Sequence, residues 1–541
     1  MKKAIHLLAV SLVVMMCAFF PSCTSEKAPD LKVKLETIVS DNTSVVMSGD
    51  IHRLFEQLDI VVEKGHIVLP DYLKTALCND EDDDEDSLDC TKVLKTLDGV
   101  DYTDAVLAFN IEPNEGLEGM LVFGLTDEKD FVSSLKKIDD SLDQGTALDY
   151  LTIGDGGQQL LIKDNLAYFV FNDYGVLMPD ESARIVERWN RMADATPLDD
   201  WKKEYLCQHR VVNCLISVNT LMANTDSMLS SSQLNRLKSV TPDGFRNGFI
   251  ALGADLDGSA MKFYLKVFDN KGAILESQMN GQFNTAMMDF AYPEDIIAAG
   301  WCMNQKGYDF LKNSLKDPNL QPNLNGYYEY RFFLTQLYEF MRDNAGVPAE
   351  YLSEGGIFAA GGLDANFSPL KYDSPSSYHV VFAADLKPAK ARAAYAEVTR
   401  SVSAMFDDAP GAGMTEVTVD GIAQKTIAVR YTTAYSAASG YNTDFFEVYI
   451  ALVDNVLVVS NKPVKRNQAI PFSKELFDGK MAAFQMTMTP ESPLMKIAGM
   501  DMGINLTAQS TGSTGELVFE FTHTDTKVIP EIFKLASYSI L

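Results

Sequence analysis

A run of carboxylates is the densest group of chemistry-bearing residues in the sequence. Eight of the ten residues from Asp80 to Asp89 are acidic, and carboxylate oxygens are ligands that Ca²⁺ prefers. An EF-hand loop also needs glycine at position six and glutamate at position twelve, but counting from Asp80 gives Glu85 and Thr91. We therefore expect a solvated loop and no metal site, with weak divalent-ion binding as the alternative.

Histidine and nucleophile motifs predict no catalytic centre. The mature chain has five scattered histidines: His52, His66, His209, His379 and His523. Because no HExxH or His-x-His pair occurs, we expect surface or core histidines rather than metal ligands. The sequence also lacks a Gly-x-Ser-x-Gly elbow and a Walker A motif. We expect no catalytic residue and no cofactor, and a hydrolase that uses paired carboxylates is the enzymatic alternative.

Two aromatic segments are the best candidates for a binding surface. Residues 326–340 hold seven aromatics in fifteen positions, and part of them forms a helical stripe that core packing would also explain. Outside that stripe, the candidates for contact with a partner or a sugar ring are Tyr327, Tyr328 and Phe332. In the second segment, spaced tyrosines among small residues predict a recognition loop that interrupts two strands, with Tyr431, Tyr435 and Tyr441 as candidates. A disordered insertion is the alternative for that loop.

The first residues predict export and a lipid anchor. Lys2 and Lys3 precede an apolar stretch, 4–20, that is short for a spanning helix and typical of a signal peptide. Pro21-Ser22-Cys23 follows and resembles a bacterial lipobox, in which a small residue precedes the lipidated cysteine. We predict a signal peptide over 1–22 and a lipidated Cys23 that begins a short tether, 23–30. A cleaved secretory signal is the alternative.

Charge and targeting restrict the partners and the location. Cleavage after residue 22 removes two lysines and no acid, which changes the net charge from −29 to −31. Such a chain has no basic stripe for phosphates, so we expect no nucleic-acid partner. We expect a membrane-anchored lipoprotein of a Gram-negative envelope, in the outer membrane, with its leaflet open.

Five cysteines remain after Cys17 and Cys23 are set aside. Export places them in an oxidising compartment. Two pairs are close in sequence, and we predict the disulfides Cys78–Cys90 and Cys207–Cys214. We expect the odd residue, Cys302, to be a buried thiol.

The two halves of the mature chain show the same succession of patterns. Residues 40–49 and 292–300 each read as a turn, a short apolar strand and a glycine. A helix, a strand pair and a second helix follow in each half. Asp164-Asn165 and Asp454-Asn455 then precede a strand as hairpin turns do, and each half ends in a long hairpin.

These repeats predict an α+β fold with two tandem similar domains, over 31–290 and 291–541. Alternating apolar and polar strand residues predict mainly antiparallel sheets, each with helices packed on one face. One large irregular domain is the alternative.

The order of these motifs resembles a family of Bacteroidota lipoproteins that is defined only as a domain of unknown function. The resemblance rests on the lipobox, the apolar strand with glycine, Asp98-Gly99-Val100-Asp101 before the strand Ala105–Asn110, and the segment Asn455–Asn461. It implies an envelope lipoprotein and transfers no catalytic residue.

An anchor, a duplicated scaffold and the lack of a catalytic motif favour a non-enzymatic binding or accessory role, with an envelope protein or a polysaccharide as the partner. The alternatives are the carboxylate hydrolase and a carbohydrate-capture lipoprotein. The second rests on analogy, and only three tryptophans are present for sugar stacking.

Overall fold

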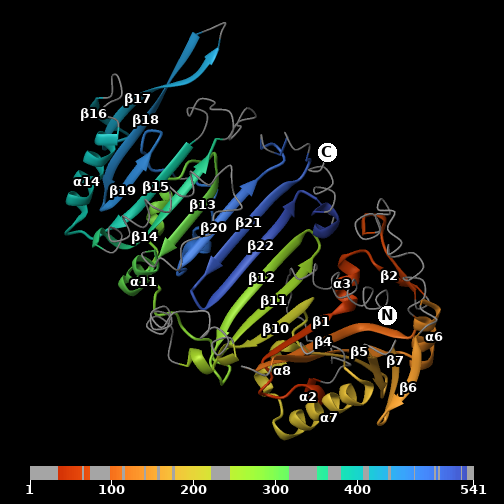
Figure 1. The fold of residues 1–541 in the computed structure, drawn as a ribbon. Helices are drawn as coiled ribbons and strands as arrows, with labels where there is room; N and C mark the ends of the chain where they lie inside the picture. Colours follow the sequence, from red (N-terminus) through yellow and green to blue (C-terminus); the bar gives the residue numbers. More distant parts are fainter. Residues whose placement is uncertain are drawn as a thin grey trace. The chain divides into compact units, whose positions relative to one another are not determined.

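The structure is a computed structural model of the 541-residue chain. It describes residues 35–63, 66–73, 98–112, 116–138, 142–154, 159–172, 177–220, 244–315, 350–362, 379–405, 413–436, 440–467, 469–492, 495–496, 500–524 and 527–532. The chain divides into two compact units, and Figure 1 labels their strands and helices. The first comprises Met1–Ser231, Asp243–Leu275 and Thr524–Leu541, and the second comprises Ser232–Pro242 and Glu276–His523. Among the described helices, none combines the length and the apolar character needed to cross a bilayer.

Ten strands of the first unit pair antiparallel in one sheet. From one side to the other they are β12 (Ala260–Phe268), β11 (Phe249–Asp257), β10 (Val212–Ser217), β1 (Val45–Asp50), β4 (Val100–Glu112), β5 (Gly116–Leu125), β9 (Leu166–Asn172), β8 (Gln159–Lys163), β7 (Tyr150–Gly154) and β6 (Asp143–Ala147). A separate small hairpin joins β2 (Val61–Glu63) and β3 (His66–Val68). The strands are antiparallel throughout, as the alternating sequence pattern predicted.

Ten strands of the second unit also pair antiparallel. In spatial order they are β22 (Thr514–Thr522), β21 (Gly503–Ser510), β20 (Ala482–Met488), β13 (Asp295–Cys302), β14 (Leu352–Gly361), β15 (His379–Leu386), β19 (Val456–Ser460), β18 (Gly440–Val453), β17 (Ile422–Ser436) and β16 (Met414–Val419). With the β2–β3 hairpin set aside, the two units place their successive strands in the same spatial order.

The matching Asp-Asn turns are confirmed as hairpin turns. Asp164 and Asn165 have φ of 54° and 59° between β8 and β9, and Asp454 and Asn455 have φ of 49° and 67° between β18 and β19. Two successive residues with positive φ are what a two-residue type I′ hairpin turn requires, and Asp and Asn tolerate that conformation.

Helices connect and cover the strands. They are α2 (Leu35–Ile38), α3 (Ile51–Gln57), α6 (Glu128–Ile138), α7 (Pro179–Ala195), α8 (Asp200–Leu206), α11 (Gln305–Leu315), α14 (Ala391–Met405) and α15 (Lys474–Phe477), with 3₁₀ turns η1 (Phe245–Asn247) and η2 (Thr285–Phe290). Helix α7 begins with Pro179, Asp180 and Glu181, and these residue types favour a helix start.

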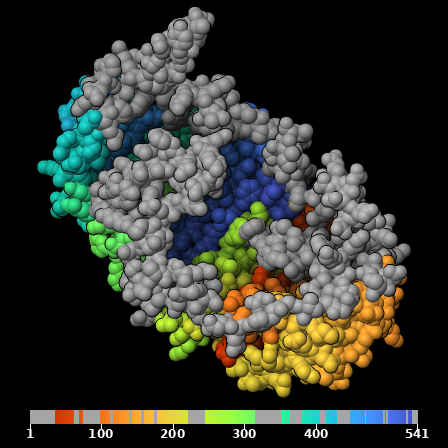
Figure 2. All heavy atoms as spheres, in the orientation of Figure 1, coloured from red at the N-terminus to blue at the C-terminus, as the bar shows by residue number. Residues whose placement is uncertain are grey.

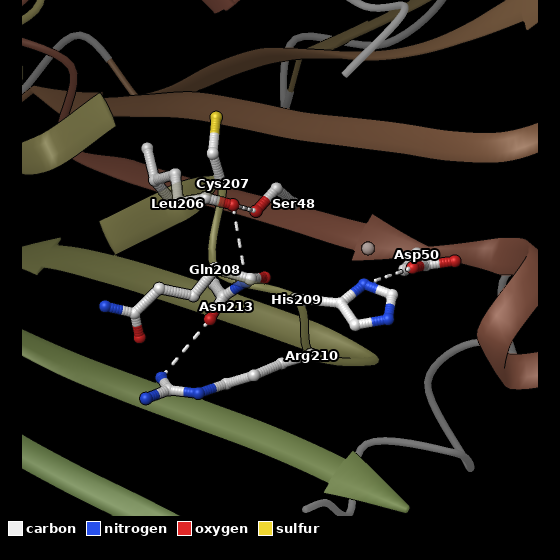
Figure 3. A pocket seen from close by; sticks show the side chains of 9 residues that line it. Ser48, Asp50, Leu206, Cys207, Gln208, His209, Arg210 and Asn213 are labelled. Carbon is white, nitrogen blue, oxygen red and sulfur yellow. Dashed lines mark hydrogen bonds and ion pairs between the residues drawn. The ribbon is translucent and has the colours of Figure 1, made fainter. Parts of the chain in front are cut away.

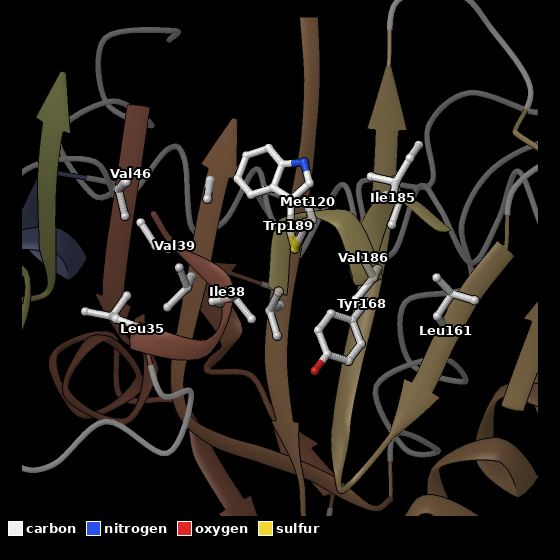
Figure 4. Packing of buried hydrophobic residues seen from close by; sticks show 14 of the residues in the cluster. Leu35, Ile38, Val39, Val46, Met120, Leu161, Tyr168, Ile185, Val186 and Trp189 are labelled. Atoms are coloured by element: carbon white, nitrogen blue, oxygen red, sulfur yellow. The ribbon is translucent and has the colours of Figure 1, made fainter. Parts of the chain in front are cut away.

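Helices cover both faces of the sheet in the first unit. On one face, Trp189 of α7 packs in a core with Val122 of β5, and Figure 4 shows Trp189 with other members of that core. The neighbouring residue of β5, Phe123, meets Phe131 of α6 edge to face, with ring centroids 5.9 Å apart. Successive strand residues point to opposite faces, so α6 and α7 lie on opposite sides.

The second unit repeats this arrangement. Val458 of β19 packs in a core with Phe290 of η2 and Phe477 of α15, whereas its neighbour Leu457 packs with Ala391 of α14. The prediction of helices on one face is therefore wrong for both units. Alternation marked one face of each strand as apolar, but it did not indicate which face of the sheet each helix covers.

The strands β20, β21 and β22 are only half buried. Every residue of β21 after Gly503 has intermediate exposure, and atoms of these strands, in blue, form part of the surface drawn in Figure 2. In register, Phe484 lies opposite Ala508, and Leu506 lies opposite Phe519, so one face of these strands is apolar. The helices and the antiparallel strand pairs described above establish the α+β class and the mostly antiparallel sheet.

Candidate functional site

The described residue cluster that most resembles a chemical site lies at one edge of the second sheet. Asp295 begins β13, His379 begins β15 and Ser460 ends β19. Strand β14 lies between β13 and β15, and β19 is antiparallel to β15. The start of β13, the start of β15 and the end of β19 therefore meet at the same edge.

The three side chains form a hydrogen-bonded relay. His379 Nδ1 lies 2.6 Å from Asp295 Oδ1, and His379 Nε2 lies 3.3 Å from Ser460 Oγ. The second carboxylate oxygen of Asp295 accepts a hydrogen bond from the Tyr292 backbone N–H at 2.7 Å. The Tyr292 ring covers the imidazole, with ring centroids 4.0 Å apart.

This order of groups is that of a serine-hydrolase triad, in which histidine takes a proton from the serine and the carboxylate orients the histidine. The relay differs from such a triad in that a substrate has no access to its serine and histidine. His379 is 0% exposed and Ser460 is 4% exposed, and Ser460 Oγ already accepts the Lys462 backbone N–H at 3.1 Å. A reacting carbonyl must come within about 3 Å of the nucleophile, and in this arrangement the relay is closed to it. Its evident action is to bind three strands together through satisfied buried polar groups.

A second buried polar pair lies in the first unit. Arg53 of α3 contacts Asp255 of β11 at two points, Nε to Oδ1 at 2.5 Å and Nη2 to Oδ2 at 2.7 Å. The carboxylate is fully buried. Burial raises the pKa of Asp255 to about 6, and the Arg53 charge opposes that rise without cancelling it. A carboxyl with a raised pKa is a mark of catalytic acids, but this one is held in an ion pair by Arg53.

A small cavity in the first unit lies between β1 and the segment that joins α8 to β10 (Figure 3). Its space is about 10 Å³, which suits about one water molecule. His209 Nδ1 faces Asp50 Oδ2 at 3.3 Å, and Asp50 also caps α3 by accepting the Arg53 backbone N–H at 2.8 Å. The cavity is too small for an organic substrate.

The predicted disulfide Cys207–Cys214 is absent, because the structure has thiols at both positions. Cys207 packs on the core that contains Leu215, whereas Cys214 is the neighbour of Leu215 in β10 and so lies on the opposite face of the sheet. Proximity in sequence thus did not bring the two sulfurs together. Burial raises the pKa of the Cys214 thiol to about 12. Cys302 is buried, in agreement with the prediction of a buried thiol.

The predicted recognition loop with Tyr431, Tyr435 and Tyr441 is instead part of two long strands. Tyr431 lies in β17 opposite Asp444 of β18, and Tyr435 lies opposite Tyr441. Tyrosine, threonine and phenylalanine favour strands, and their frequency here outweighs the loop-like composition. The other candidates lie outside the described residues: Cys23, Cys78, Cys90, Tyr327, Tyr328 and Phe332.

Sequence patterns alone did not identify the relay. Asp295, His379 and Ser460 lie far apart along the chain and match no local motif. The sequence did place each of the three residues at the end of an apolar strand. To infer that these strand ends meet, one would have had to know the strand order β13-β14-β15-β19 in advance.

The chain matches no known protein family and no curated protein. Among solved structures, it is similar to TP0453 at 10% identity and a TM-score of 0.22, over 45% of this chain and 79% of that one. A proposed DNA polymerase III beta subunit from Eubacterium rectale ATCC 33656 has 8% identity and a TM-score of 0.09, over 89% and 100%. The Helicobacter pylori beta clamp has 10% identity and a TM-score of 0.13, over 88% and 100%. These likenesses are too slight to assign this chain a function.

Proposed function

We propose that the chain is a lipid-anchored cell-envelope protein with a non-enzymatic binding or accessory role. The observation that carries the proposal is the amino-terminal sequence, in which two lysines and an apolar stretch lead to Pro21-Ser22-Cys23. A diacylglycerol thioether and an amide-linked acyl chain on Cys23 would anchor the protein stably, since each buried methylene contributes about 0.8 kcal/mol.

We also infer that the body consists of two similar domains. The compact units divide the chain near residues 275 and 276 and return 524–541 to the first unit, so their bounds differ from the predicted 31–290 and 291–541. The equal spatial order of ten successive strands in the two units supports a duplication. The paired Asp-Asn turns at equivalent places support it as well. A duplicated sheet scaffold offers surfaces for a partner and requires no catalytic centre.

The described polar clusters favour binding over catalysis. A carboxylate hydrolase needs two acids that flank a cleft, whereas Asp255 is bound to Arg53. The relay of Asp295, His379 and Ser460 has the order of a triad but is buried. The cavity beside His209 has room for about one water.

Replacement of Cys23 tests the anchor. We expect Cys23→Ser to abolish metabolic incorporation of labelled palmitate and to release the protein from the membrane fraction. Cys17→Ser is the matched control, because it changes a cysteine inside the signal peptide and leaves Cys23 in place. Palmitate incorporation into Cys23→Ser, or its membrane retention, would contradict the proposal.

Cross-linking in intact cells tests the binding role. The natively lipidated chain is treated with a lysine-reactive cross-linker, and its adducts are sequenced by mass spectrometry. We expect one reproducible envelope partner above the background of an unrelated lipoprotein. An absence of partners, together with turnover of an envelope substrate by the purified chain, would overturn it.

A further inference from the structure

The hairpin of β17 and β18 extends well beyond the strands on either side of it (Figure 1). Strand β16 pairs with β17 only over 422–427, and β19 pairs with β18 only over 449–453. Beyond these contacts, residues 429–436 and 440–446 pair with each other in seven positions, from Val429 opposite Phe446 to Ser436 opposite Gly440. We call these two segments the arm. At about 3.4 Å per residue, the arm is roughly 25 Å long.

The fold of the second unit does not require the arm. The hairpin at the equivalent place in the first unit, β7 with β8, has four paired positions among its described residues, from Leu151 opposite Ile162 to Gly154 opposite Gln159. An isolated two-stranded ribbon is marginally stable in water. Packing of the second unit therefore does not explain a ribbon of this length.

In the described part of the chain, no third strand pairs with the backbone of either outer edge of the arm. Natural edge strands are usually protected from added strands by lysine, proline or short length. The arm has no lysine and no proline, and it is rich in tyrosine, threonine and phenylalanine, which favour strands.

The charge of the arm also suits association. Arg430 and Asp444 are its only charged residues, so its formal charge is zero in a chain of net charge −29. A negatively charged protein that approaches this chain is repelled by its net charge. The arm itself adds no net charge to that repulsion.

We propose that the arm is a docking element that pairs edge to edge with an extended strand of an envelope protein partner. This inference rests on the proposed binding role and specifies where the partner binds and in what conformation. Strand addition supplies affinity through main-chain hydrogen bonds and specificity through alternate side chains. The occupant is a partner strand, because sugars and acyl chains cannot extend a ladder of N–H and C=O groups.

Site-specific photo-cross-linking locates the contact. The full-length lipidated chain is produced in cells with p-benzoylphenylalanine at Tyr435, or at Leu148 as the control. Leu148 is an exposed residue at the tip of the β6–β7 hairpin. We expect one discrete adduct from position 435 and none from position 148, with the linked partner residue in an extended segment.

A shortened arm then tests the mechanism. Residues 429–446 are replaced by Asn-Gly, which joins the paired residues Ala428 and Glu447 through a two-residue turn. A synthetic peptide of about ten residues from the cross-linked partner segment is titrated against both full-length chains. We expect the peptide to bind the native chain, to slow amide exchange in the arm at least about tenfold, and to lose at least about tenfold in affinity for the shortened chain.

Three results would overturn the inference: no adduct at position 435, an adduct only with a second copy of this chain, or equal peptide binding by both chains. Lysine cross-linking of the shortened chain separates the two proposals. A retained partner would remove the arm inference and leave the binding role intact, whereas loss of every partner from the native chain would remove both. An unchanged melting temperature of the shortened chain shows that it is folded.

Discussion

His379 and Asp295 meet across a glycine. Their side chains lie 2.6 Å apart although β14 separates their strands. Gly361 of β14 is in register with both residues, and a Cβ built there would lie 2.3 Å from the Asp295 Cα. The missing side chain lets carboxylate and imidazole join the first and third strands of the second unit directly.

Removal of the Asp295 carboxylate should therefore destabilise the second unit strongly. Asp295→Ala leaves the His379 ring N–H and the Tyr292 backbone N–H without their acceptor in a buried place, and we expect a loss of about 3 kcal/mol in the free energy of unfolding. Urea unfolding measures the loss. Glu294→Ala is the matched control, since Glu294 is exposed and pairs with Lys462 at the surface, where such pairs contribute at most about 1 kcal/mol. Similar losses for both variants would contradict a joining role.

Ser460 should not react with a fluorophosphonate probe in the folded chain. The probe must reach the serine oxygen, and Ser460 is 4% exposed with the imidazole beside it fully buried. Mass spectrometry of the probe-treated, full-length chain checks the expectation, with Ser460→Ala as the blank. Stoichiometric labelling at Ser460 that is absent from Ser460→Ala would show an accessible nucleophile and favour a serine hydrolase.

Local signals were sufficient for the hairpins. The Asp-Asn pairs combine residues that accept positive φ with flanking apolar strands, so the turns at Asp164 and Asp454 could be located from a few neighbouring residues. Helix α6 spans Glu128–Ile138. Its acidic first turn and its Lys136-Lys137 end are local features as well.

Contacts between distant strands were not predictable in the same way. The relay depends on which strands are neighbours, and sequence periodicity reports the face of a residue and not the order of the strands. The proposed Cys207–Cys214 pair failed for a related reason. Sequence proximity suggested contact, but Cys207 packs on one face of the sheet and Cys214 lies on the other.

Arg53→Met should lower stability more at neutral than at acidic pH. Burial raises the folded pKa of Asp255 from 3.8 to about 6, so the folded state binds this proton more tightly. The free energy of unfolding then falls as the pH rises from about 4 to about 6. Without Arg53 the buried carboxylate has no countercharge and its pKa rises further. We expect a loss of about 3–5 kcal/mol at pH 7.5 and a clearly smaller loss at pH 4.5.

Urea titrations of the first unit's unfolding at the two pH values measure this difference. Lys262→Met is the control, because the Lys262–Asp257 pair lies at the surface and should contribute at most about 1 kcal/mol with little dependence on pH. An Arg53→Met loss that is equal at both pH values would show that Asp255 does not titrate as described.

The cysteines should differ in reactivity under native conditions. Cys214 is buried and burial raises its pKa to about 12, so it has almost no thiolate at pH 8 and should resist iodoacetamide. Cys207 is only partly buried and should react at least about tenfold faster. Peptide mapping without reductant, before and after denaturation, gives both rates and detects disulfides. A Cys207–Cys214 disulfide in the map would contradict the placement of the two sulfurs on opposite faces, whereas a Cys78–Cys90 disulfide would support the loop closure predicted around the acidic run.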